Sequence, residues 1–231
     1  MRAEPRALAA PGAAGPALET GRPAAVQSNV DTGRPAWVRL AARRWRPAAA
    51  LALLAAVCVA PAARAENSFD REGLKFFHQT LYNPTVHDFM SAYTEAGNGA
   101  VLLAGCGALA LLGHDSLATT GKVAAAATLG AGALAVGIKL LVDRPRPDGP
   151  NTRWESSFPS GHATCSFAVA TVVARRHPRA APWAYAAATL VGISRLYLGR
   201  HWPTDVLAGA ALGYASGRLA VWEAERQWPG R

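Results

Sequence analysis

Five apolar runs follow one another along this 231-residue chain, and short polar joints separate them. The runs cover residues 100–112, 123–142, 163–174, 182–193 and 206–221. A helix needs ~20 residues to cross a bilayer, so each run is long enough to cross or nearly cross one. The chain is 51% hydrophobic and 17% charged, which leaves too few charges for an ordinary soluble surface. The sequence predicts an all-α fold, a polytopic transmembrane helix bundle of five to six spans.

Run 163–174 is short, since 1.5 Å per residue gives it only ~18 Å. Its helix is expected to begin near Ser160 and to reach about His177. Glycines are frequent in the runs, and small residues let helix backbones approach closely where lipid removes the hydrophobic drive. The glycines expected to act in this way are Gly105, Gly107, Gly130, Gly132, Gly137, Gly209 and Gly213.

The net charge of +9 is concentrated at the N-terminus. Residues 1–46 hold eight arginines against Glu4, Glu19 and Asp31, which is +5, and the rest of the chain carries +4. The chain has no lysine-rich run, so we expect no binding to nucleic acid. Residues 1–38 are rich in Ala, Pro, Gly and Arg without an apolar period, which predicts a disordered or over-annotated extension.

Residues 39–65 have the layout of a signal peptide. A basic flank with four arginines precedes the apolar run 48–60, and Ala63, Arg64 and Ala65 form an A-x-A cleavage site before Glu66. The alternative is that the run is retained as a first transmembrane helix that extends to about Ala63. Both interpretations place Glu66 outside the cytoplasm.

Residues 66–97 carry mixed charges and several aromatic side chains, which favours amphipathic helices at the membrane interface. His78 and His87 lie here without the spacing of a zinc site, so no metal is predicted. Cys58, Cys106 and Cys165 are odd in number and lie in apolar runs, which indicates buried small residues rather than disulfides.

The basic joints fix the predicted orientation. Arg43–Arg46, Lys122, Arg175–Arg179 and the tail from Arg218 belong in the cytoplasm by the positive-inside rule. Joints 66–98, 143–162 and 194–205 then share the outer face. The arginines of that face break the rule, which suggests a bound anion there. They are Arg144, Arg146, Arg195 and Arg200.

Three polar islands lie in the outer joints and suit the transfer of a phosphoryl group, which requires spread negative charge to be held while a nucleophile is aligned. Arg146 and Arg195 offer planar forks for phosphate oxygens, and Lys139 offers a point charge. Ser160 is a natural N-cap, and Gly161 lets backbone amides at the helix start approach an anion.

Three residues are the candidates for the chemistry itself. A turn and the first turn of the last helix would set the Asp205 carboxylate against the His201 imidazole, leaving the other ring nitrogen as a nucleophile. His162, from the facing loop, would protonate the departing oxygen and then activate water. Taken singly, each residue also suits a structural role, such as a helix cap for Asp205.

The motifs K-x6-R-P at 139–147, P-S-G-H at 159–162 and S-R-x5-H-x3-D at 194–205 resemble those of the type 2 phosphatidic acid phosphatase (PAP2) superfamily. The resemblance implies His201 as nucleophile assisted by Asp205, and His162 as acid and base. It also implies the absence of metal and cofactor. The phosphate-binding residues that it implies are Lys139, Arg146, Ser160, Gly161 and Arg195.

The apolar surroundings favour the membrane lipid phosphatase branch. We expect residues 66–222 to form a phosphatase domain in a bacterial inner membrane with its site facing the periplasm, and residues 223–231 to form a cytoplasmic tail. The substrate would be isoprenyl diphosphate, phosphatidic acid or phosphatidylglycerol phosphate, and Arg200 is a weak indication of a diphosphate. The alternatives are a soluble periplasmic acid phosphatase and a non-enzymatic anion-binding membrane protein.

Overall fold

The computed structural model describes residues 67–149 and 155–227, all within one compact unit, Ala36–Arg231. Helices and short connections make up these residues, and β-pairing among them is limited to one isolated bridge between Arg146 and Gly149. The predicted all-α class is confirmed. The predictions for residues 1–38 and 39–65, together with Cys58, lie outside the described residues.

Each of the five apolar runs lies within a helix. The helices are α4 (Gly99–Leu112), α5 (Asp115–Val142), α6 (Gly161–Arg176), α7 (Ala181–Tyr197) and α8 (Pro203–Gln227). α6 begins directly after its N-cap Ser160 and ends at its C-cap His177, which is the extension that its short apolar run required. The apolar pattern therefore located the helices, and polar flanking residues set their ends.

Residues 67–98 form shorter helices that precede the five. They are α2 (Ser68–Leu74), the π-helix η3 (Lys75–Thr80), α3 (Pro84–Thr94) and the 3-10 helix η4 (Glu95–Gly97). Asparagine side chains cap the N-termini of α2, α3 and α4, because their amide oxygens accept hydrogen bonds from orphan backbone N–H groups. Phe69, Phe76, Tyr82 and Phe89 are exposed along this segment.

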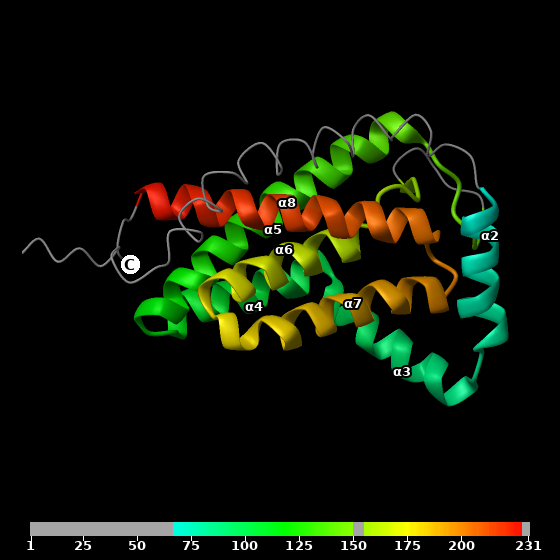
Figure 1. The fold of residues 1–231 in the computed structure, drawn as a ribbon, viewed down its shortest axis with the longest axis horizontal. Coiled ribbons are helices and arrows are strands. Elements are labelled where there is room, and N and C mark those ends of the chain that lie inside the picture. The colour runs from blue at the N-terminus through cyan, green and yellow to red at the C-terminus, as the bar shows by residue number, and fades with distance from the viewer. Residues whose placement is uncertain (1–66, 150–154, 228–231) are drawn as a thin grey trace, which may run out of the picture. The chain divides into compact units, whose positions relative to one another are not determined.

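α6 is the central helix, since it packs against α5, α7 and α8 (Figure 1). Its contact with α8 is the most extensive, and glycines at every fourth position of α8 make it possible. A Cβ at Gly217 would lie 2.7 Å from the Ala168 oxygen, and one at Gly213 would overlap the Thr164 oxygen. The two backbones are therefore in direct contact.

The expectation for the glycines holds only in part. Gly209 and Gly213 pack tightly as predicted, and Gly217 continues their stripe. A Cβ added at Gly105, Gly107, Gly130 or Gly137 would meet no atom within 4 Å, and Gly132 only approaches the Cys165 sulfur at 3.9 Å. The prediction was wrong for these glycines because glycine content does not reveal which face of a helix meets a neighbour.

Successive helices alternate in direction, so the bundle has two chemically different ends. At one end the start of α5 meets the end of α6, where Arg176 Nε donates to Thr120 Oγ1 at 2.9 Å. At the other end the segment after α5 meets the start of α8, and α2 lies across that end (Figure 1). All three polar islands are gathered at this second end.

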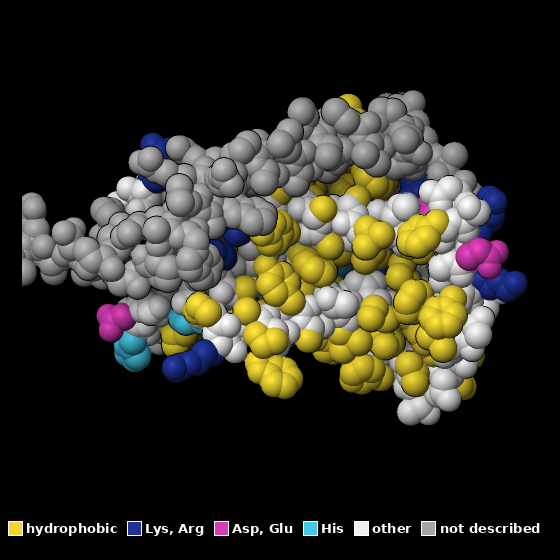
Figure 2. All heavy atoms as spheres, in the orientation of Figure 1, with side chains coloured by type: hydrophobic (Ala, Val, Ile, Leu, Met, Phe, Trp, Pro, Cys, Tyr) yellow, Lys and Arg dark blue, Asp and Glu magenta, His cyan; other side chains and the backbone are white. Residues whose placement is uncertain are grey.

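The described helices differ in their suitability to cross a membrane. Among them, α5 alone is both long and apolar enough, and α3–η4 with α4 passes as a pair across a 56° bend. Hydrophobic side chains cover the middle of the face seen in Figure 2, and the charged side chains lie toward its two ends. Leu111, Leu141 and Trp183 are among the exposed apolar side chains of the described helices.

We expect Gly213→Ala to destabilise the protein by about 1–3 kcal/mol, because its methyl group would overlap the Thr164 backbone oxygen. The matched control is Gly137→Ala, whose methyl group would meet open space and should gain up to about 1 kcal/mol of helix propensity. Thermal unfolding of the purified variants in detergent measures both. Equal melting temperatures would contradict the backbone contact between α6 and α8.

Candidate active site

Four helix ends supply the residues of the candidate site. Lys139 lies in the last turn of α5, and Arg195 lies in the last turn of α7. His162 lies in the first turn of α6, and Asp205 lies in the first turn of α8. His201 belongs to the turn that joins α7 to α8. The alternation of helix directions thus brings the three polar islands together.

The three predicted phosphate-binding cations are anchored by polar groups. Lys139 Nζ donates to the backbone oxygen of Ser156, and Arg146 Nε donates to that of Glu155 at 2.7 Å. Arg195 is buried, and its Nη1 donates to Thr94 Oγ1 at 2.9 Å. Each of these hydrogen bonds fixes part of a side chain, and so fixes the direction in which its positive charge points.

The start of α6 has the features of an anion site. Ser160 is buried, and its hydroxyl accepts from the Ala163 amide at 3.5 Å. The Ser160 amide donates to the Asp205 backbone oxygen at 3.0 Å, which ties this helix start to α8. A Cβ at Gly161 would meet no atom within 4 Å, so glycine leaves open space beside the helix N-terminus.

The connection between α7 and α8 turns sharply before His201. Gly199 has φ of +67°, a left-handed conformation that favours glycine. A Cβ there would also lie 3.1 Å from the His78 ring, whose Nδ1 is 2.8 Å from the Tyr197 backbone oxygen. Glycine at this position therefore lets the turn fit against the segment that precedes α4.

His201 and Asp205 are buried side by side. His201 Nδ1 lies 3.5 Å from Asp205 Oδ2, which is too far for a strong hydrogen bond but fixes the ring edge that faces the carboxylate. The same carboxylate oxygen accepts from Trp202 N at 2.8 Å and from the Ser157 hydroxyl. Asp205 is thus held in place by its neighbours on two sides.

His162 faces the same charged cluster. Its Nε2 is buried and has no hydrogen-bond partner among the described residues. Its charge state is coupled electrostatically to Arg195, His201, Arg146 and Lys139. A bound anion would offset the surrounding positive charge and so favour the protonated ring, which could then give its proton to a leaving oxygen.

Burial lowers the pKa of His201 from 6.5 to about 4, although Asp205 opposes the shift. The positive charges of Lys139 and Arg195 lower it further. The imidazole is therefore neutral at pH 7, which is the state that a nucleophile requires.

Two of the four arginines expected on the outer face, Arg144 and Arg200, pair with carboxylates. Arg144 is only 1% exposed and pairs with Asp70 and Asp205, with both N–O distances 2.6 Å. Arg200 pairs with Asp148 at 2.7 Å, which weakens its indication of a diphosphate. Carboxylates already hold these two side chains, so the expected anion site depends on Arg146 and Arg195.

Sequence reasoning missed four residues that support the site. Asp70, Ser157 and Thr204 are hydrogen-bonded into the surroundings of Asp205, and Arg144 links them. Ser157 and Thr204 are close to motif residues in the sequence, and that proximity could have suggested that they support the site. Asp70 lies far upstream in a segment of mixed charge, where nothing in its spacing distinguishes it.

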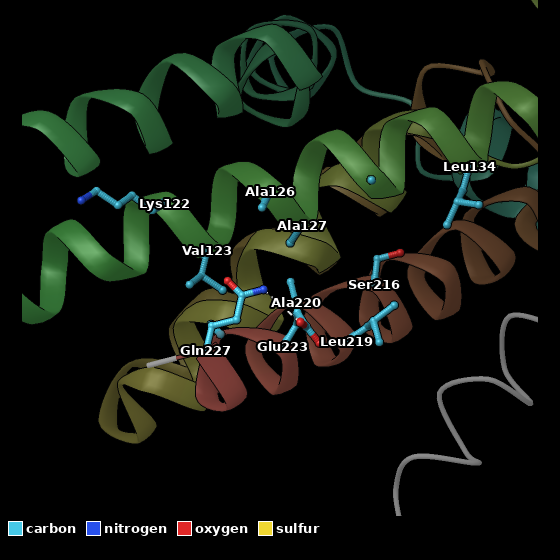
Figure 3. A pocket seen from close by; sticks show the side chains of 12 residues that line it. Lys122, Val123, Ala126, Ala127, Leu134, Ser216, Leu219, Ala220, Glu223 and Gln227 are labelled. Carbon is cyan, nitrogen blue, oxygen red and sulfur yellow. Dashed lines mark hydrogen bonds between the residues drawn. The ribbon is translucent and has the colours of Figure 1, made fainter. Parts of the chain in front are cut away.

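A cavity of about 360 Å³ lies between α5 and α8 (Figure 3). Lys122, Val123, Ser216 and Glu223 are among the residues that line it, which places it toward the opposite ends of these helices. It is therefore separate from the candidate site. Among residues 67–149 and 155–227, no three His, Cys, Asp or Glu side chains cluster in a way that could hold a metal ion.

Residues 121–228 match the model of the PAP2 superfamily, and this region contains all three motifs. Over 83 residues, the chain is 42% identical to lipid A 1-phosphatase of Porphyromonas gingivalis, covering 34% of this chain and 18% of that protein. Over 103 residues, it is 40% identical to decaprenylphosphoryl-5-phosphoribose phosphatase of Mycobacterium tuberculosis, covering 42% of this chain and 57% of that protein. The chain thus spans less than two thirds of each of these relatives.

The fold is similar to the crystal structure of a transmembrane PAP2 type phosphatidylglycerolphosphate phosphatase from Bacillus subtilis. The TM-score is 0.60 and the sequence identity 25%, covering 81% of this chain and 100% of that chain. The prediction of a PAP2-superfamily region is confirmed across residues 121–228, and the fold agrees with that of one membrane phosphatase of this superfamily.

The depressed pKa of His201 makes a prediction about acid stability. Between pH 6.5 and about 4, the unfolded chain binds a proton at this ring that the folded protein refuses, so stability falls as the pH falls. The gap corresponds to about 3 kcal/mol. We expect His201→Gln to lose less stability than the wild type between pH 7.5 and 5, measured by thermal unfolding. An equal loss would show that His201 titrates normally in the folded state.

Proposed function

Because the chain carries a PAP2-superfamily region across residues 121–228, we propose that it is a membrane phosphatase that hydrolyses a lipid phosphate or diphosphate through a phosphohistidine. The convergence of His162, His201 and Asp205 with Lys139, Arg146 and Arg195 at one end of the bundle carries this proposal. Isoprenyl diphosphate, phosphatidic acid and phosphatidylglycerol phosphate are the candidate substrates.

The proposed reaction begins with the phosphate held by the cations and by the amides at the start of α6. Asp205 faces the Nδ1–H of His201 and holds the ring in that tautomer, which leaves the Nε2 lone pair free to attack phosphorus. His162 gives its proton to the departing alkoxide or phosphate oxygen. The same residue then takes a proton from water as the water attacks the phosphohistidine, which releases phosphate and restores His201.

The cations act by stabilising charge, and they do not react. Arg146 and Arg195 present planar forks to the equatorial phosphate oxygens, and Lys139 adds a third positive charge beside them. Backbone oxygens accept hydrogen bonds from Lys139 and Arg146 and hold both side chains in place. The bound phosphate would therefore stay in line with the His201 nitrogen. This reaction needs no metal or cofactor.

We propose that α4 to α8 cross the membrane as five spans, with a sixth only if run 48–63 is retained. By length and composition alone, α6 does not qualify as a membrane span. Its neighbouring helices cover it, so its buried polar residues Thr164, Ser166 and Thr171 do not face lipid. α5 meets the length and composition expected of a membrane span, and α6 and α8 pack beside it (Figure 1). Exposed apolar side chains on α4, α5 and α7 disfavour the soluble acid phosphatase.

The positive-inside rule supports the orientation in which the site faces the periplasm, if the membrane is the proposed bacterial inner membrane. Lys122, Arg175, Arg176 and Arg179 lie at the end of the bundle opposite to the site. These four Lys and Arg side chains at one end favour that end as cytoplasmic. The phosphatase domain at residues 66–222 and the cytoplasmic tail at 223–231 remain proposals, and α8 continues into the proposed tail as far as Gln227.

Phosphate release in the presence of EDTA tests the proposed activity. We expect the protein in detergent to hydrolyse at least one of the three lipid substrates, and His201→Ala to lower kcat by about a thousandfold or more because it removes the nucleophile. A soluble nitrophenyl phosphate completes the substrate panel. Release from that ester alone would favour the soluble acid phosphatase, and no release at all would favour the anion-binding protein.

A covalent intermediate gives a second test. His162→Ala should accumulate acid-labile, alkali-stable phosphate on the protein when nitrophenyl phosphate is the donor, because nitrophenolate needs no acid to leave but water still needs a base. The control is His162→Ala combined with His201→Ala, which should stay unlabelled. Equal labelling of the double variant would show that the phosphate resides on another residue.

A further inference from the structure

We propose that Asp70 and Arg144 are positioning residues that orient Asp205 toward His201. Asp70 lies in α2, outside the region that matches the superfamily, and no motif includes it. Arg144 lies within the K-x6-R-P stretch, but at one of its unspecified positions. This inference deepens the proposed function and rests on it, because it concerns how the nucleophile is prepared.

Arg144 forms a buried bridge between two carboxylates. Its Nη1 donates to Asp205 Oδ1 at 2.6 Å, and its Nη2 donates to Asp70 Oδ2 at 2.6 Å. The two aspartates are 0% exposed and the arginine 1%. Short charge-assisted hydrogen bonds at this depth fix the geometry of all three side chains.

Thr204 closes the network at the start of α8. Its amide donates to Asp70 Oδ1 at 2.9 Å, and its hydroxyl is 2.9 Å from Asp70 Oδ2 and 2.7 Å from Arg144 Nη1. α2 also packs closely here, since a Cβ on Gly73 would lie 2.7 Å from the Pro203 ring. Asp70 therefore holds both the arginine and the helix turn that carries Asp205.

The network assigns the two oxygens of Asp205 to different tasks. Oδ1 accepts from Arg144, whereas Oδ2 accepts from Trp202 N and Ser157 and faces His201 Nδ1. With Oδ1 held, the carboxylate cannot rotate away from the imidazole. Asp205 thereby keeps His201 in the tautomer whose Nε2 is unprotonated.

Asp70 also gives the buried network a net negative charge. Arg144 with Asp205 alone would be a neutral pair that offers little negative charge to the histidine. With Asp70, the three groups carry a net charge of −1 at a site that is closed to solvent. That charge stabilises the positive imidazole ring that forms when His201 takes up the phosphoryl group.

Steady-state kinetics of Asp70→Asn on the best lipid substrate test the proposal. We expect kcat to fall by about tenfold to a hundredfold, as when an orienting group is lost, and KM to stay within about twofold, because Asp70 does not touch the phosphate. Asp70→Glu keeps the charge and should restore part of kcat. The control is Asp88→Asn, the same change at a carboxylate that is 89% exposed, which should behave as the wild type.

Thermal unfolding separates positioning from folding. A loss of kcat in the fraction of Asp70→Asn that remains folded supports positioning, whereas a loss that only follows the folded fraction overturns it. If Asp70→Asn does not fold, the isosteric Thr204→Val removes one hydroxyl from the network. It should lower kcat in the same direction with KM unchanged, and an unchanged kcat would overturn the proposal.

The His201→Ala variant distinguishes this proposal from the proposed function. If His201→Ala is inactive and Asp70→Asn is as active as the wild type, the positioning proposal alone is wrong. If His201→Ala retains activity, the nucleophile assignment fails and the positioning proposal fails with it.

Discussion

The buried ion pairs of Arg144 hold the catalytic end of this bundle together. They join α2, the segment after α5 and the first turn of α8, which lie far apart in the sequence. Burying three charges carries a large desolvation cost, which is offset only when the hydrogen bonds are well made. Here Thr204, Ser157 and Trp202 N supply the additional hydrogen bonds. An interaction that is costly to bury is weak evidence for a stabilising role, and its place beside His201 supports the positioning role proposed for it.

Backbone contact between α6 and α8 sets the spacing of the site. Because Gly209, Gly213 and Gly217 let the two helices touch, the start of α6 lies directly against the start of α8. The Ser160 amide then reaches the Asp205 backbone oxygen. The start of α6 and the His201–Asp205 pair are thus held at a fixed separation by the most extensive helix contact among the described residues.

The helices before α4 take part in the site as well as lying beside it. Thr94 accepts a hydrogen bond from Arg195, and Asp70 accepts one from Arg144. His78 packs against Gly199. Four aromatic side chains of the same segment are exposed: Phe69, Phe76, Tyr82 and Phe89. One short segment therefore presents an apolar surface on its exposed side and holds three parts of the catalytic end on its buried side.

The sequence by itself determined the helical class, the position of each long helix and the residues of the three motifs. Apolar runs and N-capping residues are local signals, and a motif is read from residues close together in the chain. The sequence did not reveal the role of Asp70, the pairing of Arg144 and Arg200, or which glycines are in contact. These features depend on distant segments of the chain. Asp70 meets Arg144 only because α2 lies across the end of the bundle. A glycine permits close helix packing only on the face that another helix covers. The tertiary structure decided them because burial and partnership are properties of the folded chain.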